Sequence, residues 1–193
     1  MRTKTAAITL SCAMLFSAAA SAQDNRVVRL VGEINNASAN RVIAELESLS
    51  AKDKDAPITV WLNSSGGYLY EGFRIREKIT AIPNKVDIVC GGQASSMAAV
   101  LFITHQKTKG ERIVFQACDI MTHAPYRKEG NKLVTFTSAR DLAESRHRFA
   151  MMLHAAANIP YGAALAYFGL NDRKIGLEEA QRWGLIDRLI PAP

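Results

Sequence analysis

Cysteine is scarce in this sequence, and the signals of several common functions are missing. Three cysteines in 193 residues exclude a small domain that is held together by disulfide bonds. Neither of the glycine-rich nucleotide patterns, G-x-G-x-x-G and G-x-x-x-x-G-K-[ST], is present, so we expect no nucleotide cofactor and no coenzyme. No set of cysteines and histidines has the spacing of metal ligands, so we expect no metal either.

Basic residues outnumber acidic ones, but they do not gather into a basic patch. There are 24 Lys and Arg against 18 Asp and Glu, with a formal net charge of +6, which by itself suggests a nucleic-acid or anionic-membrane partner. The bases are interleaved with acids, as in Glu71–Lys78 and Arg140–Arg148, and no basic block carries aromatic residues. We therefore expect no nucleic-acid partner. With 48% apolar and 22% charged residues, the composition is that of an ordinary globular protein.

The first 22 residues have the pattern of a cleavable secretory signal peptide. Arg2 and Lys4 form a short basic start, residues 6–20 carry no charge, and Ala20-Ser21-Ala22 supplies small residues for a signal peptidase. The uncharged run is shorter than the roughly 20 residues that a transmembrane helix needs, which disfavours a retained anchor. We expect a mature chain of residues 23–193 in a periplasmic or secreted location, where disulfides are permitted and free ATP is not expected.

Strand and helix patterns alternate along residues 23–193. The predicted strands are Arg26–Glu33, Pro57–Asn63, Val86–Cys90, Arg112–Phe115, Ile120–Thr122 and Leu185–Ile190, and Gly66-Gly67 and Gly91-Gly92 are expected to end the second and third. The predicted helices are Ala37–Ala51, Tyr70–Ile82, Ser96–His105, Ser138–Asn158, Pro160–Phe168 and Leu177–Trp183. This alternation predicts one α/β domain with a mainly parallel sheet. The polar, basic segment Tyr126–Val134 is expected to leave the core.

Ser96 lies where a predicted strand turns sharply into a helix of small residues. Ligands of α/β folds gather beyond the carboxyl ends of strands, and a serine beside a helix N-terminus has backbone N–H groups nearby that would stabilise an oxyanion. Position alone nevertheless favours a helix-capping serine, and Ser95 competes for the same role. The pattern is not the G-x-S-x-G elbow of α/β-hydrolases, because Ala94 and Ala98 replace its glycines.

A histidine and several acids are candidates to act with this serine. His123 follows an apolar strand pattern and lies in a strand-end loop, whereas the other histidines lie on helical stretches and are expected to be surface or packing residues. The candidates for an orienting acid are Asp119, Asp141, Asp172 and Asp187. Spacing does not choose among them, although Asp187 lies inside a strand pattern and is expected to be structural. The glycine pair Gly66-Gly67 would let backbone N–H groups approach a bound carbonyl closely.

Four ordered motifs resemble those of ClpP, the proteolytic subunit of the Clp protease. The chain has N-S-S-G-G from Asn63, G-Q-A-S-S-M-A-A from Gly92, M-T-H-A-P from Met121, and D-R-K-I-G-L-E-E-A from Asp172, followed by G-L-I-D from Gly184. The family shows N-S-P-G-G, G-Q-A-A-S-M-G-A, M-I-H-Q-P and D-R-x-x-x-x-x-E-A with G-L-V-D in the same order. The resemblance extends over residues 26–190.

The resemblance assigns roles to individual residues. It implies that Ser96 is the nucleophile of a serine endopeptidase, that His123 is the general base, and that Asp172 is the acid of the triad. It also implies that the backbone N–H groups of Gly67 and Met97 form the oxyanion hole. The implied fold is the ClpP/crotonase fold of repeated α/β turns with a protruding handle, here Tyr126–Asn158.

The resemblance also implies partners and a substrate. Members of the family assemble into homo-oligomeric rings through the handle, and their usual partner is a cytosolic unfoldase driven by ATP. An exported chain would lack that partner, so we expect ATP-independent hydrolysis of short or unfolded peptides. The segment Gly67-Tyr68-Leu69-Tyr70 is expected to be extended, with Tyr68 and Leu69 pairing with the substrate backbone as an added strand. Ser65, Ala98 and Ala124 depart from the family motifs, but none of them removes a catalytic group.

Cys90 and Cys118 precede Ser96 and His123 by six and five residues. A disulfide between them would brace the two strands that carry the catalytic residues. Both cysteines lie in apolar runs, however, and this favours two buried thiols over the disulfide.

Three other functions remain open on the sequence. A crotonase-type enzyme of the same fold would need coenzyme A and glutamates as acid and base. A Ser–Lys peptidase would need a catalytic lysine. A non-enzymatic assembly or binding protein with preserved site residues is the third alternative.

Overall fold

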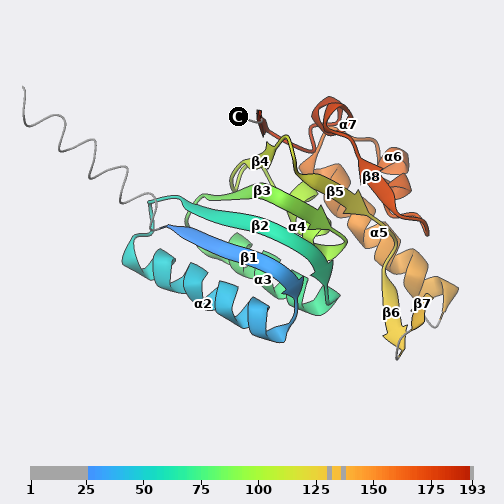
Figure 1. The fold of residues 1–193 in the computed structure, drawn as a ribbon, viewed down its shortest axis with the longest axis horizontal. Coiled ribbons are helices and arrows are strands. Elements are labelled where there is room, and N and C mark those ends of the chain that lie inside the picture. Colours follow the sequence, from blue (N-terminus) through green and yellow to red (C-terminus); the bar gives the residue numbers. More distant parts are fainter. Residues whose placement is uncertain (1–25, 130–131, 136–137, 192–193) are drawn as a thin grey trace, which may run out of the picture.

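The computed structural model describes residues 26–129, 132–135 and 138–191 (Figure 1). The signal peptide predicted for residues 1–22 lies outside the described residues. The strands are β1 (Val27–Ile34), β2 (Ile58–Gly67), β3 (Val86–Ser95), β4 (Arg112–Phe115), β5 (Asp119–Thr122), β6 (Tyr126–Glu129), β7 (Lys132–Thr135), β8 (Arg173–Ile175) and β9 (Arg188–Ile190). The helices are α2 (Asn36–Lys52), α3 (Leu69–Ala81), α4 (Met97–Ile103), α5 (Ala139–Ala156), α6 (Tyr161–Ala166) and α7 (Leu177–Arg182). Among the described helices, none is long and apolar enough to span a bilayer.

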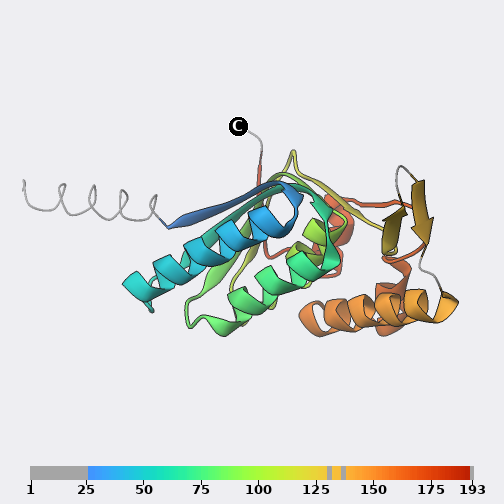
Figure 2. The ribbon, with the colours of Figure 1, turned by 90° about the horizontal axis from the view of Figure 1, so that it is seen from below.

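The main sheet is almost entirely parallel. Strands β1, β2, β3, β4 and β9 lie side by side in that order, and all of these pairs are parallel. Strand β5 pairs in parallel with the last residues of β3, and β8 pairs antiparallel with β5. These pairings confirm the predicted α/β fold. Strands β6 and β7 form a separate antiparallel hairpin, which lies away from the main sheet as expected for this polar segment (Figure 2).

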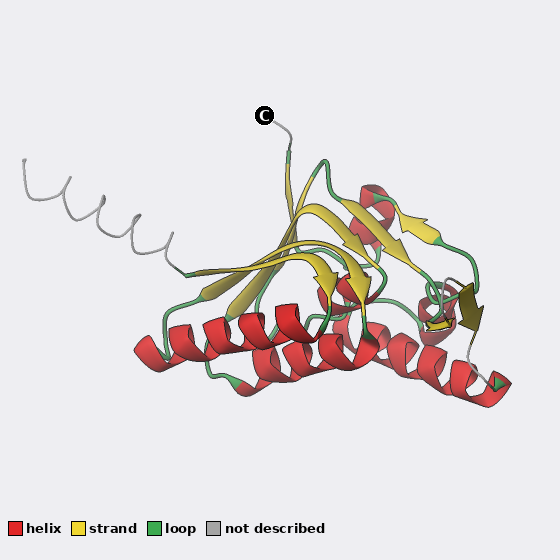
Figure 3. Ribbon diagram, turned by 60° about the horizontal axis from the view of Figure 1, so that its bottom comes forward, coloured by secondary structure: helices red, strands yellow, loops and turns green. Residues whose placement is uncertain are grey.

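Helices α2 and α3 cover one face of the main sheet (Figure 3). Helix α2 begins with a capping box, in which Asn35 accepts a hydrogen bond from the Ser38 backbone and the Ser38 hydroxyl accepts one from the Asn35 backbone. Its buried residues recur at helical spacing and face the sheet; they are Ala39, Val42, Leu46 and Ser50. The periodicity that predicted this helix therefore reflects a buried stripe on one side.

Two of the predicted strands extend further than expected, because the glycine pairs lie inside them. Strand β2 runs through Gly67 and strand β3 through Ser95, with an irregularity in their pairing after Leu62. A Cβ on Gly91 would lie 2.0 Å from the Trp61 ring, and one on Gly92 would lie 2.8 Å from Asn63 Oδ1. These glycines therefore permit close packing between neighbouring strands and do not end β3.

Asp187 is structural, as predicted. Its carboxylate accepts hydrogen bonds from Arg112 Nε at 2.9 Å and Arg112 Nη2 at 3.0 Å, and the Arg112 side chain is 2% exposed. Burial alone would raise the pKa of Asp187, but the hydrogen bonds and charge of Arg112 outweigh burial and lower that pKa below its usual value. The pair joins the start of β4 to the start of β9, at the edge of the sheet away from the candidate site.

Candidate active site

Ser96 occupies a strained backbone position between β3 and α4. Among the described residues it is the only non-glycine residue with a positive φ, at 54°. Its N–H donates to the carbonyl of Met121 at 2.9 Å, which ties the turn to β5. Such strain costs about 1–3 kcal/mol, and it is found preferentially at active sites.

The Ser96 hydroxyl is not used as a helix cap. Asn35 and Ser138 cap their helices from extended backbone conformations and accept hydrogen bonds through their side chains, whereas Ser96 makes no side-chain capping bond. Ser95, the competing serine, is 2% exposed, and its hydroxyl accepts a hydrogen bond from Gln93 Nε2 at 2.9 Å. The expectation that the Ser96 hydroxyl caps the helix is therefore wrong. Unlike the Ser95 hydroxyl, it also accepts no hydrogen bond from Gln93.

His123 is brought to Ser96 by the pairing of β3 with β5. In that register Ser95 pairs with Met121, and His123 directly follows the last residue of β5. The imidazole is nearly buried, with 9% exposed. Its Nδ1 lies 2.6 Å from the carbonyl oxygen of Ala124, and its ring stacks on that of Tyr126 with 4.7 Å between centroids and 15° between planes.

Asp172 is brought to His123 by the pairing of β5 with β8. Thr122 pairs with Arg173 in this antiparallel register, so the next positions outward on the two chains are His123 and Asp172. Asp172 is exposed, and within the part of the chain that the structure describes its carboxylate accepts no hydrogen bond and forms no ion pair. Three of the predicted site residues thus meet at one end of the sheet, but no hydrogen bond joins Asp172 to the histidine.

Gly66 packs directly against the Ser96 turn. A Cβ on Gly66 would lie 2.6 Å from the Ser95 carbonyl oxygen, 2.7 Å from Ser96 Cβ and 2.9 Å from the Met97 nitrogen. Gly67, with a φ of 148°, lies against Ile34 on β1. The sequence marked the glycine pair but did not show that its first member is the one in contact with Ser96.

Comparisons with known proteins show the family of this chain. The chain is 31% identical over 165 residues to the ATP-dependent Clp protease proteolytic subunit 3 of Rhodococcus jostii, which covers 86% of this chain and 81% of that protein. It is 30% identical over 167 residues to the subunit of the same name in Streptomyces coelicolor, covering 86% of this chain and 76% of that protein. The sequence model of the Clp protease family matches residues 13–193. The chain belongs to the Clp protease family.

Membership of the Clp protease family supports a peptidase on an α/β scaffold. Asp119, Asp141 and Asp187 are the acids that spacing left open beside Asp172, and Asp187 is engaged with Arg112 at the other edge of the sheet.

Among the described residues, no group of three or more His, Cys, Asp and Glu could hold a metal ion.

The segment after Gly67 is extended for a shorter distance than we expected. Tyr68 is extended, at φ −67° and ψ 125°, but α3 begins at Leu69, and the Gly72 N–H already donates to the Tyr68 carbonyl. Leu69 and Tyr70 are therefore helical, so the expectation that Leu69 pairs with a substrate as an added strand is wrong. Tyr68 itself is 64% exposed beside the glycine pair, so it remains a candidate contact for a peptide in this Clp protease family member.

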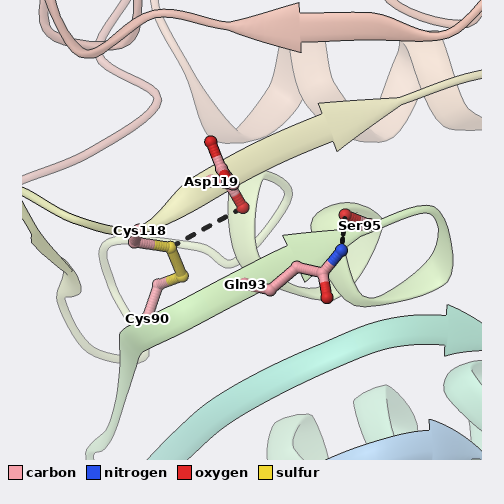
Figure 4. The surroundings of a disulfide bond; sticks show 5 residues. All are labelled: Cys90, Gln93, Ser95, Cys118 and Asp119. Carbon is pink, nitrogen blue, oxygen red and sulfur yellow. Dashed lines mark hydrogen bonds between the residues drawn. A yellow bond between two sulfur atoms is a disulfide. The ribbon is translucent and has the colours of Figure 1, made fainter.

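Cys90 and Cys118 form a disulfide, so the expectation of two buried thiols is wrong. Their Cα atoms are 6.0 Å apart, and the cysteines are separated by 28 positions (Figure 4). Cys90 is the last residue of β3 that pairs with β4, and Cys118 directly precedes β5. The disulfide therefore links β3 to the start of β5, at the point along β3 where its pairing partner changes from β4 to β5. Spacing along the sequence could not show this, because both residues also fit an apolar interior.

Alanine at Gly66 is expected to lower kcat/KM for peptide hydrolysis by about 100-fold. The added Cβ would overlap the Ser96 turn, and the φ of +92° at this position strains any L side chain, so the serine would be displaced. The matched control is Gly162→Ala, because a Cβ there has no atom within 4 Å. Circular dichroism would verify that both variants are folded, and equal kcat/KM values for the two would contradict the expectation.

Reduction of the disulfide is expected to lower the free energy of unfolding by about 3–4 kcal/mol, because a cross-link across 28 positions restricts the unfolded chain. Urea unfolding of residues 23–193 with and without a phosphine reductant measures the difference. A variant with Cys90→Ser and Cys118→Ser serves as the control and should not respond to the reductant. Identical unfolding curves for the oxidised and reduced wild type would rule out a stabilising bond.

Proposed function

We propose that this chain is a serine endopeptidase in which Ser96 is the nucleophile, His123 the general base and Asp172 the orienting acid. The observation that carries the proposal is the backbone of Ser96, which is strained, uncapped and bonded to the strand that leads to His123. A strained serine at a strand-to-helix turn exposes its hydroxyl at the end of the sheet, where a substrate carbonyl has access.

The tautomer of His123 suits a general base. A carbonyl oxygen only accepts hydrogen bonds, so the Nδ1 atom beside the Ala124 oxygen carries the proton, and Nε2 has a free lone pair. In the proposed reaction Nε2 takes the Ser96 hydroxyl proton as Oγ attacks the peptide carbonyl, and later returns it to the leaving amine. Asp172 would hold this tautomer and stabilise the imidazolium once it bonds Nδ1.

Backbone N–H groups of Met97 and Gly67 are the proposed donors to the oxyanion. Met97 opens α4 directly after Ser96, so the positive end of that short helix adjoins the nucleophile. At Gly67, the bond to β1 is made by the N–H of the next residue, Tyr68, which donates to Ile34. In a parallel ladder this leaves the Gly67 N–H directed away from β1, toward the side of β3.

The substrate and setting follow from the same site. We infer that short or unfolded peptides are hydrolysed after export to the periplasm or the medium. The disulfide supports an oxidising compartment, because such bonds persist there and are rare in the cytosol. Both curated relatives are named as proteolytic subunits of an ATP-dependent protease. We propose that this chain works as a homo-oligomeric ring without an ATP-driven partner.

Covalent labelling tests the proposed nucleophile. The purified chain of residues 23–193 would be treated with a fluorophosphonate that modifies activated serines, digested and mapped by mass spectrometry. The proposal expects the adduct on the peptide that carries Ser96, and loss of the adduct after heat unfolding. Labelling of a different serine, or hydrolysis of a fluorogenic peptide with no labelled serine, would overturn it.

A further inference from the structure

The Tyr126 ring contacts the face of the proposed general base. The 15° angle and 4.7 Å separation place the tyrosine ring nearly parallel to the His123 imidazole. Tyr126 is 45% exposed, so packing into the core does not explain where its ring lies. The stack adds to the bond between Nδ1 and Ala124, and together these two contacts fix the plane of the imidazole.

In this orientation the Nδ1 atom of His123 bonds a backbone carbonyl and not Asp172. Nδ1 donates to Ala124, while the carboxylate of Asp172 has no partner among the described residues. Rotation of the imidazole about its Cβ–Cγ bond is the movement that takes Nδ1 off Ala124 and frees it for Asp172. A rotation other than a half-turn tilts its plane away from the Tyr126 ring, so it breaks the stack together with the bond to Ala124.

Unsatisfied polar atoms nearby support a resting arrangement. Thr122 Oγ1 and Arg173 Nε are buried and have no hydrogen-bond partner in the described structure. These two residues pair with each other in the register of β5 and β8, directly beside His123 and Asp172. A buried polar group without a partner costs about 1–3 kcal/mol. Rearrangement of this end of the sheet would give such groups the chance to find partners.

We propose that Tyr126 is a positioning residue that holds His123 in a resting orientation, which must be released before Asp172 can orient the base. This proposal rests on the peptidase function proposed above and adds a control on the same site. Tyr126 is the first residue of the β6–β7 hairpin, which is not part of the main sheet (Figure 2). The position of the Tyr126 ring therefore does not depend on a strand pairing of the main sheet.

The rate of Ser96 phosphonylation measures the effect. Aromatic stacking contributes about 0.5–1.5 kcal/mol, so Tyr126→Ala should accelerate labelling about two- to ten-fold. Tyr126→Phe keeps the ring and should react at the wild-type rate. Tyr70→Ala is the matched surface control, because Tyr70 is 73% exposed on α3 and has no ring contact in the described structure.

The orientation of His123 is measured separately by NMR of the full mature chain. The stack should shift the imidazole proton resonances upfield through the ring current of Tyr126, and this shift should disappear in Tyr126→Ala and persist in Tyr126→Phe. Absence of the shift in wild type, or slower or equal labelling of Tyr126→Ala, overturns the role of Tyr126. If no variant is labelled at all, the serine peptidase function fails instead, and the ring-current shift alone then decides whether Tyr126 orients His123.

Discussion

Replacing Ser96 by alanine is expected to lower kcat for peptide hydrolysis by about 10⁶-fold while KM changes little. The loss is large because Ser96 Oγ forms the acyl bond in the proposed mechanism, whereas the hydroxyl of the neighbouring Ser95 is bonded to Gln93. Substrate binding should persist, because alanine removes one oxygen and keeps the backbone N–H groups of Met97 and Gly67. A fluorogenic peptide assay over a range of substrate concentrations separates the two constants.

The control for Ser96→Ala lies one residue away. Ser95→Ala removes a hydroxyl that is buried and accepts a hydrogen bond from Gln93, so kcat should stay near the wild-type value. A modest loss of stability, about 1 kcal/mol for the lost hydrogen bond, is expected from thermal unfolding. If the losses of kcat in the two variants were reversed, Ser95 would be the nucleophile, and equal losses would point to damage of the turn as a whole.

Much of the fold could be predicted because its signal is local. The apolar stripe of α2 and the continuous apolar run of β2 each reflect burial on the sheet, and this burial sets their periodicity. The glycine pair in β3 misled the prediction, since its role is to admit the Trp61 ring and the Asn63 side chain from a neighbouring strand. Strand β8 escaped prediction because it has only three residues, two of them charged.

The site shows the same division between local and long-range information. The sequence places Ser96 at a turn, but its capping and catalytic roles differ only in backbone conformation and hydrogen bonding, which a sequence does not display. Four aspartates were equivalent by spacing, whereas the register of β5 with β8 places Asp172 alone opposite His123. The contact of Tyr126 with His123 carried no signal at all, because a stack between residues three apart depends on the path of the loop.

If Asp172 is the acid of the proposed triad, its replacement by asparagine is expected to lower kcat by about 10⁴-fold, as the same change does in a Ser-His-Asp triad. If the amide NH₂ faces the imidazole, it donates to Nδ1 and leaves Nε2 protonated and unable to act as a base. If the amide oxygen faces it, the bond from Nδ1–H is kept, but the negative charge that stabilises the imidazolium is lost. The matched control is Asp119→Asn, because Asp119 is also exposed and lies at the start of β5, whereas His123 follows the end of that strand. Steady-state hydrolysis of the same fluorogenic peptide measures both variants, and Asp119→Asn should retain the wild-type kcat.

The Asp172 experiment also separates two ways of orienting His123. In the described structure the Ala124 carbonyl holds the Nδ1 proton at 2.6 Å, so a serine–histidine pair oriented by the backbone is a physical alternative to the triad. A carbonyl fixes the tautomer as well as a carboxylate does, but it lacks the negative charge that stabilises the imidazolium in the transition state. If Asp172→Asn retained kcat within about tenfold of wild type, the backbone carbonyl would be the working partner. A loss near 10⁴ would instead make Asp172 the working partner, as the proposed release of His123 from Ala124 and Tyr126 predicts.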